Sequence, residues 1–289
     1  MDSQYFLSLA HRELKSALCE IKISINLVTS LPTVEEQYYL DQTHLSTSNC
    51  SRYWIPWTED IGVWIDGDGQ GVEIVLSQAF SDTNIESSLV NCMTAVVIGA
   101  CLNLQGRIAI HANAVAISNK AAAFVGYSGR GKSTLTAYCL SCGAGFITDD
   151  VLNVDKFGNV NLGYPRVKLY PHTGEHLGID ATGETDYKLH YHPEKFGGKL
   201  QQKPLPLASI FFLEESADKC IRSEQLSSSQ AVFELLTHSY YASQLVSQKP
   251  SILDAYISLV TQTPVKKLFY PREFTTLPEV YKFLLAEVN

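Results

Sequence analysis

Residues 121–134 read AAAFVGYSGRGKST and decide how the surrounding sequence folds. The short apolar run 121–125 leads directly into a segment with three glycines, and residues 133–142 after it read as a helix that ends at Gly143. A strand, a glycine-rich turn and a helix in this order predict an α/β arrangement. The glycines allow a turn so tight that several backbone N–H groups point into one small space.

The segment Gly126–Ser133 matches the phosphate-loop pattern GxxxxGK followed by Ser or Thr. In such a loop the amides and the positive end of the following helix bind phosphate oxygens. Lys132 would reach the β- and γ-phosphates, and the Ser133 hydroxyl would join the coordination shell of Mg²⁺. ATP and Mg²⁺ are therefore the expected ligands, and the expected nucleotide contacts are Gly126, Ser128, Gly129, Arg130, Gly131, Lys132, Ser133 and Thr134.

Two adjacent carboxylates, Asp149 and Asp150, follow the apolar run 145–148. A metal-binding acid is expected at the end of a strand next to the phosphate loop. Because neighbouring side chains point in different directions, the two acids are predicted to act separately. One would hold Mg²⁺, directly or through water, and the other would accept the proton of an acceptor hydroxyl. A pair of turn or helix-capping aspartates is the alternative interpretation.

His111 lies on the strand predicted for residues 107–117, ahead of the loop. Taken alone, a histidine among apolar residues is usually a packed core side chain. The second interpretation places His111 beside the acidic pair, where it would tune the pKa of a carboxylate.

These residues resemble the HPr kinase/phosphorylase family, which has a histidine on the strand before the loop, a GxSGxGKS loop and a strand ending in Asp-Asp. The corresponding elements here are His111, Gly126–Ser133 and Asp149–Asp150. The chain is also similar to a divergent branch of HPr-kinase-like serine kinases found with lasso-peptide and other ribosomal peptide pathways. Ile110–Ala116 and Gly126–Thr134 carry that likeness.

The resemblance implies a P-loop kinase that transfers the γ-phosphate of ATP to a serine-type hydroxyl on a peptide, protein or small metabolite. It implies that Asp149 is the general base, that His111 tunes it, and that Lys132 acts on the phosphates. It assigns the metal to Ser133 and Asp150. It also makes self-assembly into a homo-oligomer an option, although no heptad or repeat in the sequence requires one.

Residues 172–203 are polar, rich in histidine and lysine and without a clear period, which predicts a long functional or mobile loop. A phosphoryl transition state spreads negative charge over three oxygens, so an added cation would assist transfer. Lys188, Lys199 and Arg166 are the candidates, and ordinary surface charge is the alternative. The histidines are expected to face solvent or the acceptor, because no cysteine or acid completes a metal site.

The wider pattern predicts an α/β protein in two domains. Residues 1–104 form a smaller β-rich N-terminal domain, with strands near 18–28, 53–65 and 72–76, a hairpin turn at 66–71 and a connecting helix at 84–104. Residues 105–289 form a P-loop kinase domain built on a mixed sheet, with a hairpin turn at 155–163, strands at 207–213 and 265–270, and helices at 229–245, 250–262 and 278–288.

Composition narrows the class of protein. The 289 residues are 45% hydrophobic and 18% charged, as in an ordinary globular protein. A net charge of −8 argues against non-specific binding to nucleic acid or to an anionic membrane. The N-terminus lacks the pattern of a signal peptide and no apolar run is long enough to span a membrane, so a cytoplasmic location is expected. Seven scattered cysteines read as packed thiols.

Two other classes of function stay open. One is a nucleotide-binding regulatory module that transfers nothing, which would need a metal acid but not Asp149 together with His111. The other is a phosphorylase or phosphatase that acts on a phosphoserine partner.

Overall fold

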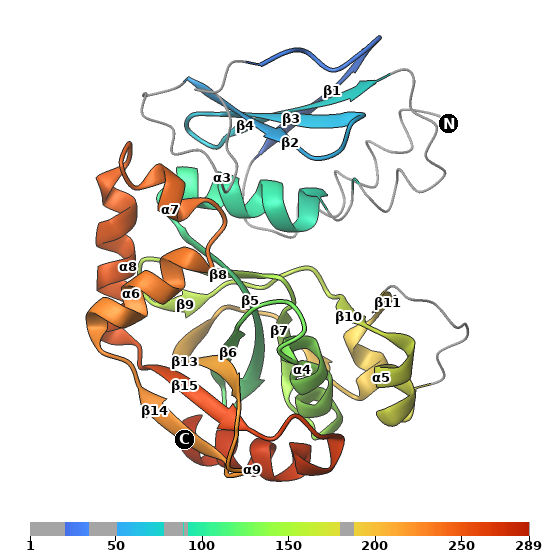
Figure 1. The fold of residues 1–289 in the computed structure, drawn as a ribbon, viewed down its shortest axis with the longest axis vertical. Coiled ribbons are helices and arrows are strands. Elements are labelled where there is room, and N and C mark those ends of the chain that lie inside the picture. Colours follow the sequence, from blue (N-terminus) through green and yellow to red (C-terminus); the bar gives the residue numbers. More distant parts are fainter. Residues whose placement is uncertain (1–20, 35–50, 78–88, 90–91, 180–187, 289) are drawn as a thin grey trace. The chain divides into compact units, whose positions relative to one another are not determined.

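In the computed structural model, the described residues are 21–34, 51–77, 89, 92–179 and 188–288. The protein is of mixed α/β class, and the chain divides into two compact units (Figure 1). Unit 1 comprises Met1–Ala109 and Ser239–Tyr256, and unit 2 comprises Ile110–His238 and Ile257–Asn289. The chain therefore leaves unit 2 after His238, contributes a second segment to unit 1, and returns within the helix α8 (Pro250–Gln262).

Unit 1 contains a four-stranded sheet in the order β1–β4–β3–β2. Its strands are β1 (Lys22–Val28), β2 (Arg52–Pro56), β3 (Ile61–Asp66) and β4 (Gly71–Ser77). The predicted hairpin is confirmed, since β3 and β4 pair antiparallel around a turn in which Gly69 has φ 73°. Trp54 and Trp64 face each other across β2 and β3, with ring centroids 5.1 Å apart. They pack within this sheet, as aromatic cross-strand pairs do.

The helices of unit 1 are the π-helical turn η2 (Cys92–Val97), α3 (Ile98–Leu104), α7 (Ala242–Leu245) and the first part of α8. The predicted connecting helix is confirmed from residue 92 onward, while residues 84–88, 90 and 91 lie outside the described residues. All seven residues of α3 are buried, which explains why that stretch is apolar on every side.

Asn103, at the end of α3, attaches the late segment of the chain to unit 1. Its side-chain amide donates to the carbonyl of Tyr240 at 2.7 Å, and its oxygen accepts from the backbone of Ala109 at 3.2 Å. The Tyr256 hydroxyl donates to the same oxygen at 3.3 Å. Because Asn103 is fully buried, removing its side chain would take a buried hydrogen bond from the Tyr240 carbonyl and from the Ala109 N–H. The Tyr256 hydroxyl would keep its bond to the Ala109 carbonyl.

Unit 2 is built on a nine-stranded mixed sheet in the order β12–β7–β5–β8–β9–β13–β15–β14, with β6 paired to both β5 and β13. The strands are β5 (Ile108–Ile117), β6 (Lys120–Val125), β7 (Gly145–Thr148), β8 (Val151–Val154), β9 (Asn159–Val160), β12 (Lys199–Leu200), β13 (Leu205–Glu215), β14 (Arg222–Gln225) and β15 (Val265–Tyr270). A separate antiparallel pair joins β10 (Val167–Leu169) to β11 (Leu189–Tyr191).

The helices of unit 2 are α4 (Lys132–Ser141), α5 (Pro171–His176), α6 (Ser228–Thr237), α9 (Leu277–Val288), and the 3₁₀ turns η3 (Pro193–Phe196) and η4 (Phe274–Thr276). α4 packs along the sheet (Figure 1), and its Leu135 and Leu140 join the core formed by Phe124 and Phe211. The Phe124 and Phe211 rings are 6.5 Å apart. This core fixes the end of β6 against the start of α4, where the glycine-rich loop lies.

Two sequence-based expectations need correction. The segment 172–203 is not one irregular loop, because its described part contains most of α5 together with β11, η3 and β12. Each of these elements is too short to show a helical or strand period in the sequence. The polar composition of the segment therefore indicated a loop. The single helix expected at 229–245 is interrupted, since Tyr241 adopts a left-handed conformation with φ 60° and starts α7 afresh.

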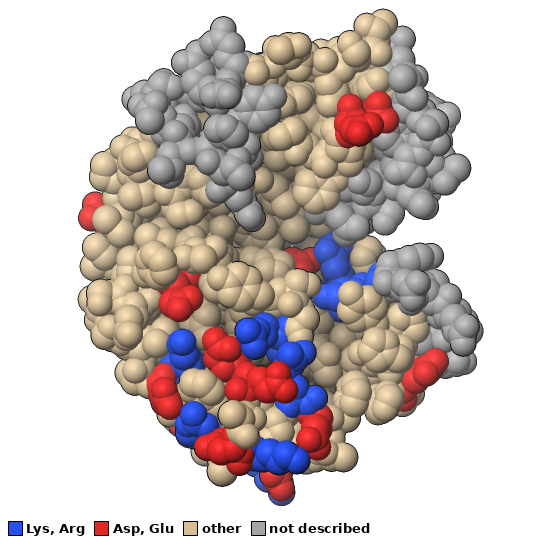
Figure 2. All heavy atoms as spheres, viewed as in Figure 1, with Lys and Arg blue, Asp and Glu red and all other residues tan. Residues whose placement is uncertain are grey.

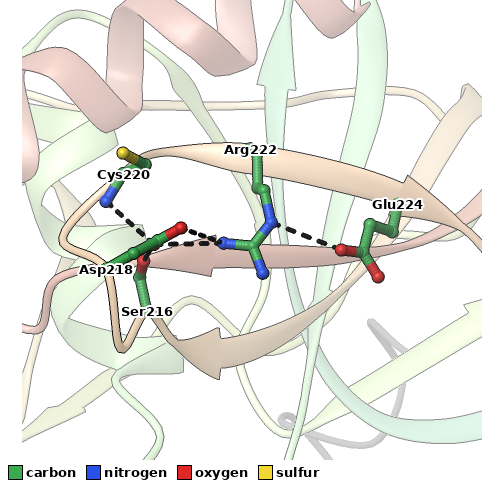
Figure 3. A network of polar contacts seen from close by, with 5 residues as sticks. All are labelled: Ser216, Asp218, Cys220, Arg222 and Glu224. Atoms are coloured by element: carbon green, nitrogen blue, oxygen red, sulfur yellow. Dashed lines mark hydrogen bonds and ion pairs between the residues drawn. The ribbon is translucent and has the colours of Figure 1, made fainter.

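Charged side chains of both signs lie interspersed over the part of unit 2 that carries β14 and β15 (Figure 2). β14 is the last strand of the sheet, and on it Arg222 bonds both Asp218 and Glu224 (Figure 3). A row of charges of this kind protects an edge strand from pairing with another chain. Within the described part of the chain, no helix is long and apolar enough to cross a membrane.

We expect Asn103→Ala to lower the free energy of unfolding by about 2–4 kcal/mol, because two buried backbone groups each lose their hydrogen bond to the side chain. Urea denaturation followed by circular dichroism measures the loss. Gln105→Ala, which removes one part-buried bond to the Gly69 carbonyl, is the control and should cost well under half as much. Equal losses in the two variants would contradict the role given to Asn103.

Candidate functional site

The loop between β6 and α4 depends on three glycines with positive φ. Gly126, Gly129 and Gly131 have φ values of 150°, 82° and 92°. Side chains with a Cβ rarely adopt these conformations, so the sequence needs glycine at each of the three positions. α4 begins immediately afterwards, with the backbone N–H of Leu135 donating to the Gly131 carbonyl at 2.9 Å.

The end of β15 braces the loop from the C-terminal side. The Tyr270 hydroxyl donates to the Arg130 carbonyl at 3.4 Å, and the Arg272 guanidinium donates to the Gly129 carbonyl. A Cβ placed on Gly131 would lie 2.9 Å from the Tyr270 oxygen. The third glycine is therefore required both by its φ and by the close approach of Tyr270.

Lys132 is bent back over the loop. Its ammonium donates to the Gly126 carbonyl at 2.6 Å and to the Tyr127 carbonyl at 3.5 Å. Burial, and next the positive charge of Lys188, lower the pKa of Lys132 to about 8. The two ammonium groups thus repel each other in a partly dry site, which favours binding of an anion between them.

Asp149 lies beside the first turn of α4. Its Oδ1 accepts from the Ser133 hydroxyl at 3.4 Å, and its Oδ2 accepts from the backbone N–H of Lys168 at 2.8 Å. Burial, followed by the charge of Asp150, raises the pKa of Asp149 to about 7.

Asp150 is paired with cations. Its Oδ2 lies 2.5 Å from the Lys168 ammonium and 3.9 Å from the Arg166 guanidinium. Burial alone would raise the pKa of Asp150, but the charge and hydrogen bond of Lys168, together with the charges of His111 and Arg166, outweigh burial and lower the pKa. The residue has φ 83°, a conformation that aspartate tolerates better than most residues.

His111 lies on β5, where its backbone N–H donates to the His238 carbonyl at 2.7 Å. Burial, and next the charge of Lys132, lower the pKa of the imidazole to about 4, although the charge of Asp150 opposes the shift. The ring is therefore neutral at pH 7. A neutral imidazole can exchange hydrogen bonds in the site without adding positive charge.

These groups meet in one cavity of about 620 Å³. The expected site residues that line it are His111, Ser128, Gly129, Gly131, Lys132, Ser133, Thr134, Asp150 and Lys188. Gly126 and Asp149 are in contact with lining residues, through Lys132 and Ser133 respectively. Arg166 reaches the site through Asp150. The cavity thus brings together most of the residues singled out in the sequence.

Two expected residues point elsewhere. Arg130 pairs with Glu214, with 3.5 Å between guanidinium nitrogen and carboxylate oxygen, and is not among the described lining residues. Lys199 is exposed on β12, opposite Gly145 of β7, and is likewise not among them. Of the three candidate cations, Lys188 lines the cavity itself.

Lys168, which lines the cavity and pairs with Asp150, was not predicted from the sequence. Val167 and Leu169 are buried in β10, whereas Lys168 between them lines the cavity. A lysine between two buried apolar residues on a short strand is a signal that could have found it, since alternate side chains face opposite sides. Asn113 of β5 and Arg272 were also missed, and both line the cavity.

The residues present fit a magnesium ion. Ser133 lines the cavity, and its Oγ lies 3.4 Å from Asp149 Oδ1. Hydroxyl and carboxylate oxygens are the hard ligands that Mg²⁺ prefers, and this ion commonly binds one or two carboxylates together with waters and substrate phosphates. A closed cage of protein ligands is therefore not needed, and the described residues contain no cluster of three or more His, Cys, Asp or Glu suited to a metal.

Comparison with known proteins gives a structural likeness but no match in sequence. No family model matches the chain, and no curated protein matches it. Among solved structures, the chain is similar to the Hpr(Ser) kinase/phosphatase from Coxiella burnetii, at 12% identity and a TM-score of 0.34, over 61% of this chain and 93% of that chain. A likeness of this degree assigns neither fold nor activity to the chain.

The two aspartates should affect stability in opposite directions at pH 8, without nucleotide or metal. Between pH 3.8 and about 7, Asp149 is protonated in the folded chain but ionised in the unfolded chain. The free energy of unfolding therefore falls as the pH rises through this range. Asp149→Asn should therefore stabilise by about 1–3 kcal/mol at pH 8 and give no gain below pH 4.

Asp150 has a lowered pKa, so its ionised form contributes stability that is present at pH 8 and lost as the pH falls. Asp150→Asn should destabilise the protein at pH 8, because the Lys168 ammonium then lacks its partner. Urea unfolding of both variants at pH 4 and pH 8 measures the effects. Shifts of the same sign at pH 8 would refute the distinct environments of the two carboxylates.

Proposed function

We propose that this protein is an ATP- and Mg²⁺-dependent phosphotransferase that moves the γ-phosphate to a serine-type hydroxyl of a peptide, protein or small metabolite. The observation that carries the proposal is the meeting, in one cavity, of the glycine loop with Lys132 and of the ion pair Asp150–Lys168. The glycine loop with Lys132 suits the phosphates of ATP. In the ion pair, Asp150 suits an acceptor hydroxyl and Lys168 suits the negative charge on the phosphoryl group that is transferred.

The phosphate side of the cavity is already arranged for an anion. The ammonium of Lys132 lies across the loop on two backbone carbonyls, and Lys188 lowers its pKa by charge repulsion. An incoming phosphate relieves this repulsion and takes over the hydrogen bonds of Lys132. Bound phosphate should accordingly raise the pKa of Lys132 and keep its ammonium fully charged.

The contacts of the acidic pair favour a division of roles opposite to the one implied by family resemblance. Asp149 bonds the Ser133 hydroxyl, so these two residues are assigned to Mg²⁺. Asp150 lines the cavity and interacts with His111, so it is assigned to the acceptor hydroxyl. When bound, Mg²⁺ would neutralise phosphate charge and hold the phosphates in place.

Transfer of the γ-phosphoryl group then requires only a weakly basic carboxylate at Asp150. The acceptor oxygen forms a bond to the γ-phosphorus, the bond from that phosphorus to the β,γ-bridging oxygen breaks, and ADP leaves. Asp150 orients the hydroxyl and receives its proton late, which suits a carboxylate of lowered pKa because the transition state is loose. Lys168 and Lys188 stabilise the charge on the transferring group, and neutral His111, which lines the same cavity, is assigned to tune Asp150.

The test is transfer of label from γ-labelled ATP, with Mg²⁺ and an extract of the source organism as the pool of acceptors. We expect a labelled acceptor with the wild type and none with Lys132→Ala, because Lys132 binds the phosphates. Asp150→Asn should lower transfer at least about 100-fold while the Kd for MgATP changes by less than about threefold. Asp218→Asn, a surface substitution in the network on β14, is the matched control with wild-type transfer.

Other outcomes separate the alternatives. Tight ATP binding with an intact nucleotide and no labelled acceptor would favour a nucleotide-binding regulatory module. Release of phosphate from a phosphoserine substrate would favour a phosphorylase or phosphatase. Full transfer by Asp150→Asn with loss of transfer by Asp149→Asn would restore Asp149 as the base.

A further inference from the structure

Asn113 has a buried side-chain amide in the candidate site and takes no part in the phosphate, metal or acceptor contacts assigned so far. It lies on β5 two positions after His111, opposite Phe124 of β6, and is 1% exposed. It lines the same cavity as His111 and Ser133. Burying a side-chain amide inside a sheet costs free energy unless its oxygen and nitrogen form hydrogen bonds. The partners of both atoms therefore indicate what the residue does.

One end of the Asn113 amide is tied to the first turn of α4. Its Nδ2 donates to the Thr136 hydroxyl at 3.2 Å and lies 3.5 Å from the Ser133 hydroxyl. Ser133 in turn donates its proton to Asp149. With the hydroxyl proton directed at Asp149 and one lone pair directed at Asn113, the second lone pair of Ser133 is left for a ligand in the cavity.

The other end of the amide has no partner. Among the described residues, nothing forms a hydrogen bond with Asn113 Oδ1, although this atom is buried. Asn153 of β8 also has a buried, unpartnered Oδ1, so that property alone does not indicate a ligand. Asn113 differs because it lines the cavity and contacts Ser133, the hydroxyl assigned to the metal.

We infer that Asn113 is a positioning residue for the metal site. Nδ2 fixes the rotamer of Ser133, and Oδ1 accepts a hydrogen bond from a water molecule of the Mg²⁺ hydration shell. Such partners orient metal ligands without touching the metal, and Mg²⁺ keeps several waters that need acceptors. The inference rests on the proposed function, because it assigns Asn113 to the Mg²⁺ that accompanies ATP.

The experiment measures how much Mg²⁺ strengthens ATP binding, as the ratio of the Kd in EDTA to the Kd in Mg²⁺, by calorimetry on the full chain. Asn113→Leu should lower this ratio about 10-fold, the usual effect of removing an outer-shell partner of a metal ligand. The Kd in EDTA should stay within about twofold, because Asn113 is not assigned to phosphate. Asn153→Leu is the matched control and should keep the wild-type ratio.

A second variant covers the case in which Asn113→Leu does not fold. Thr136→Val keeps the shape of a fully buried side chain but removes the hydroxyl that anchors Nδ2. It should lower the ratio about threefold, because one of the two anchors of the amide remains.

The outcomes distinguish this inference from the proposed function. Suppose that the wild type binds ATP more tightly with Mg²⁺ and that folded Asn113→Leu keeps the wild-type ratio. The role given to Asn113 is then wrong, and the phosphotransferase proposal stands. If Asn113→Leu does not fold, an unchanged ratio in Thr136→Val leads to the same conclusion. An equal loss in Asn153→Leu also overturns the role given to Asn113, since general destabilisation would then be the cause. If the wild type binds no ATP, the proposed function fails and the inference fails with it.

Discussion

Lys168 is the residue on which the acidic side of the cavity depends, because it binds both aspartates. Its backbone N–H donates to Asp149 at 2.8 Å and its ammonium lies 2.5 Å from Asp150. Burial and the charge of Asp150 raise the pKa of Asp149 more than Lys168 lowers it, whereas the direct ion pair with Lys168 helps to lower the pKa of Asp150. Asp150 is therefore held ionised, whereas the pKa of Asp149 is raised to about 7. Two side chains of the same type thus differ in their chemistry.

Local patterns made much of this arrangement predictable. The strand, loop and helix around Gly126–Ser133 follow from residues next to one another, and so does the hairpin around Gly69. Lys168 and Asn113 were not found, because their importance comes from partners distant in the sequence. The second segment of unit 1 was not foreseen for the same reason, since the hydrogen bonds of Asn103 that attach it leave no periodic pattern.

The roles of the two aspartates illustrate a different limit of sequence reasoning. Adjacency indicates that the side chains diverge, but not which one turns toward α4. Here Asp149 contacts Ser133 at the start of α4, while Asp150, which has φ 83°, pairs with Lys168. A backbone conformation uncommon outside glycine cannot be inferred from two identical residues in a row.

The brace that β15 places on the glycine loop also determines how separable this site is. Every residue of the loop pattern lies between positions 126 and 133, yet the hydroxyl and guanidinium that hold its carbonyls come from Tyr270 and Arg272. A fragment ending before β15 would carry the complete signature with half of its scaffold removed. The glycine loop and the C-terminal strand therefore form a single structural unit, and a transplanted loop would need both Tyr270 and Arg272 to keep these contacts.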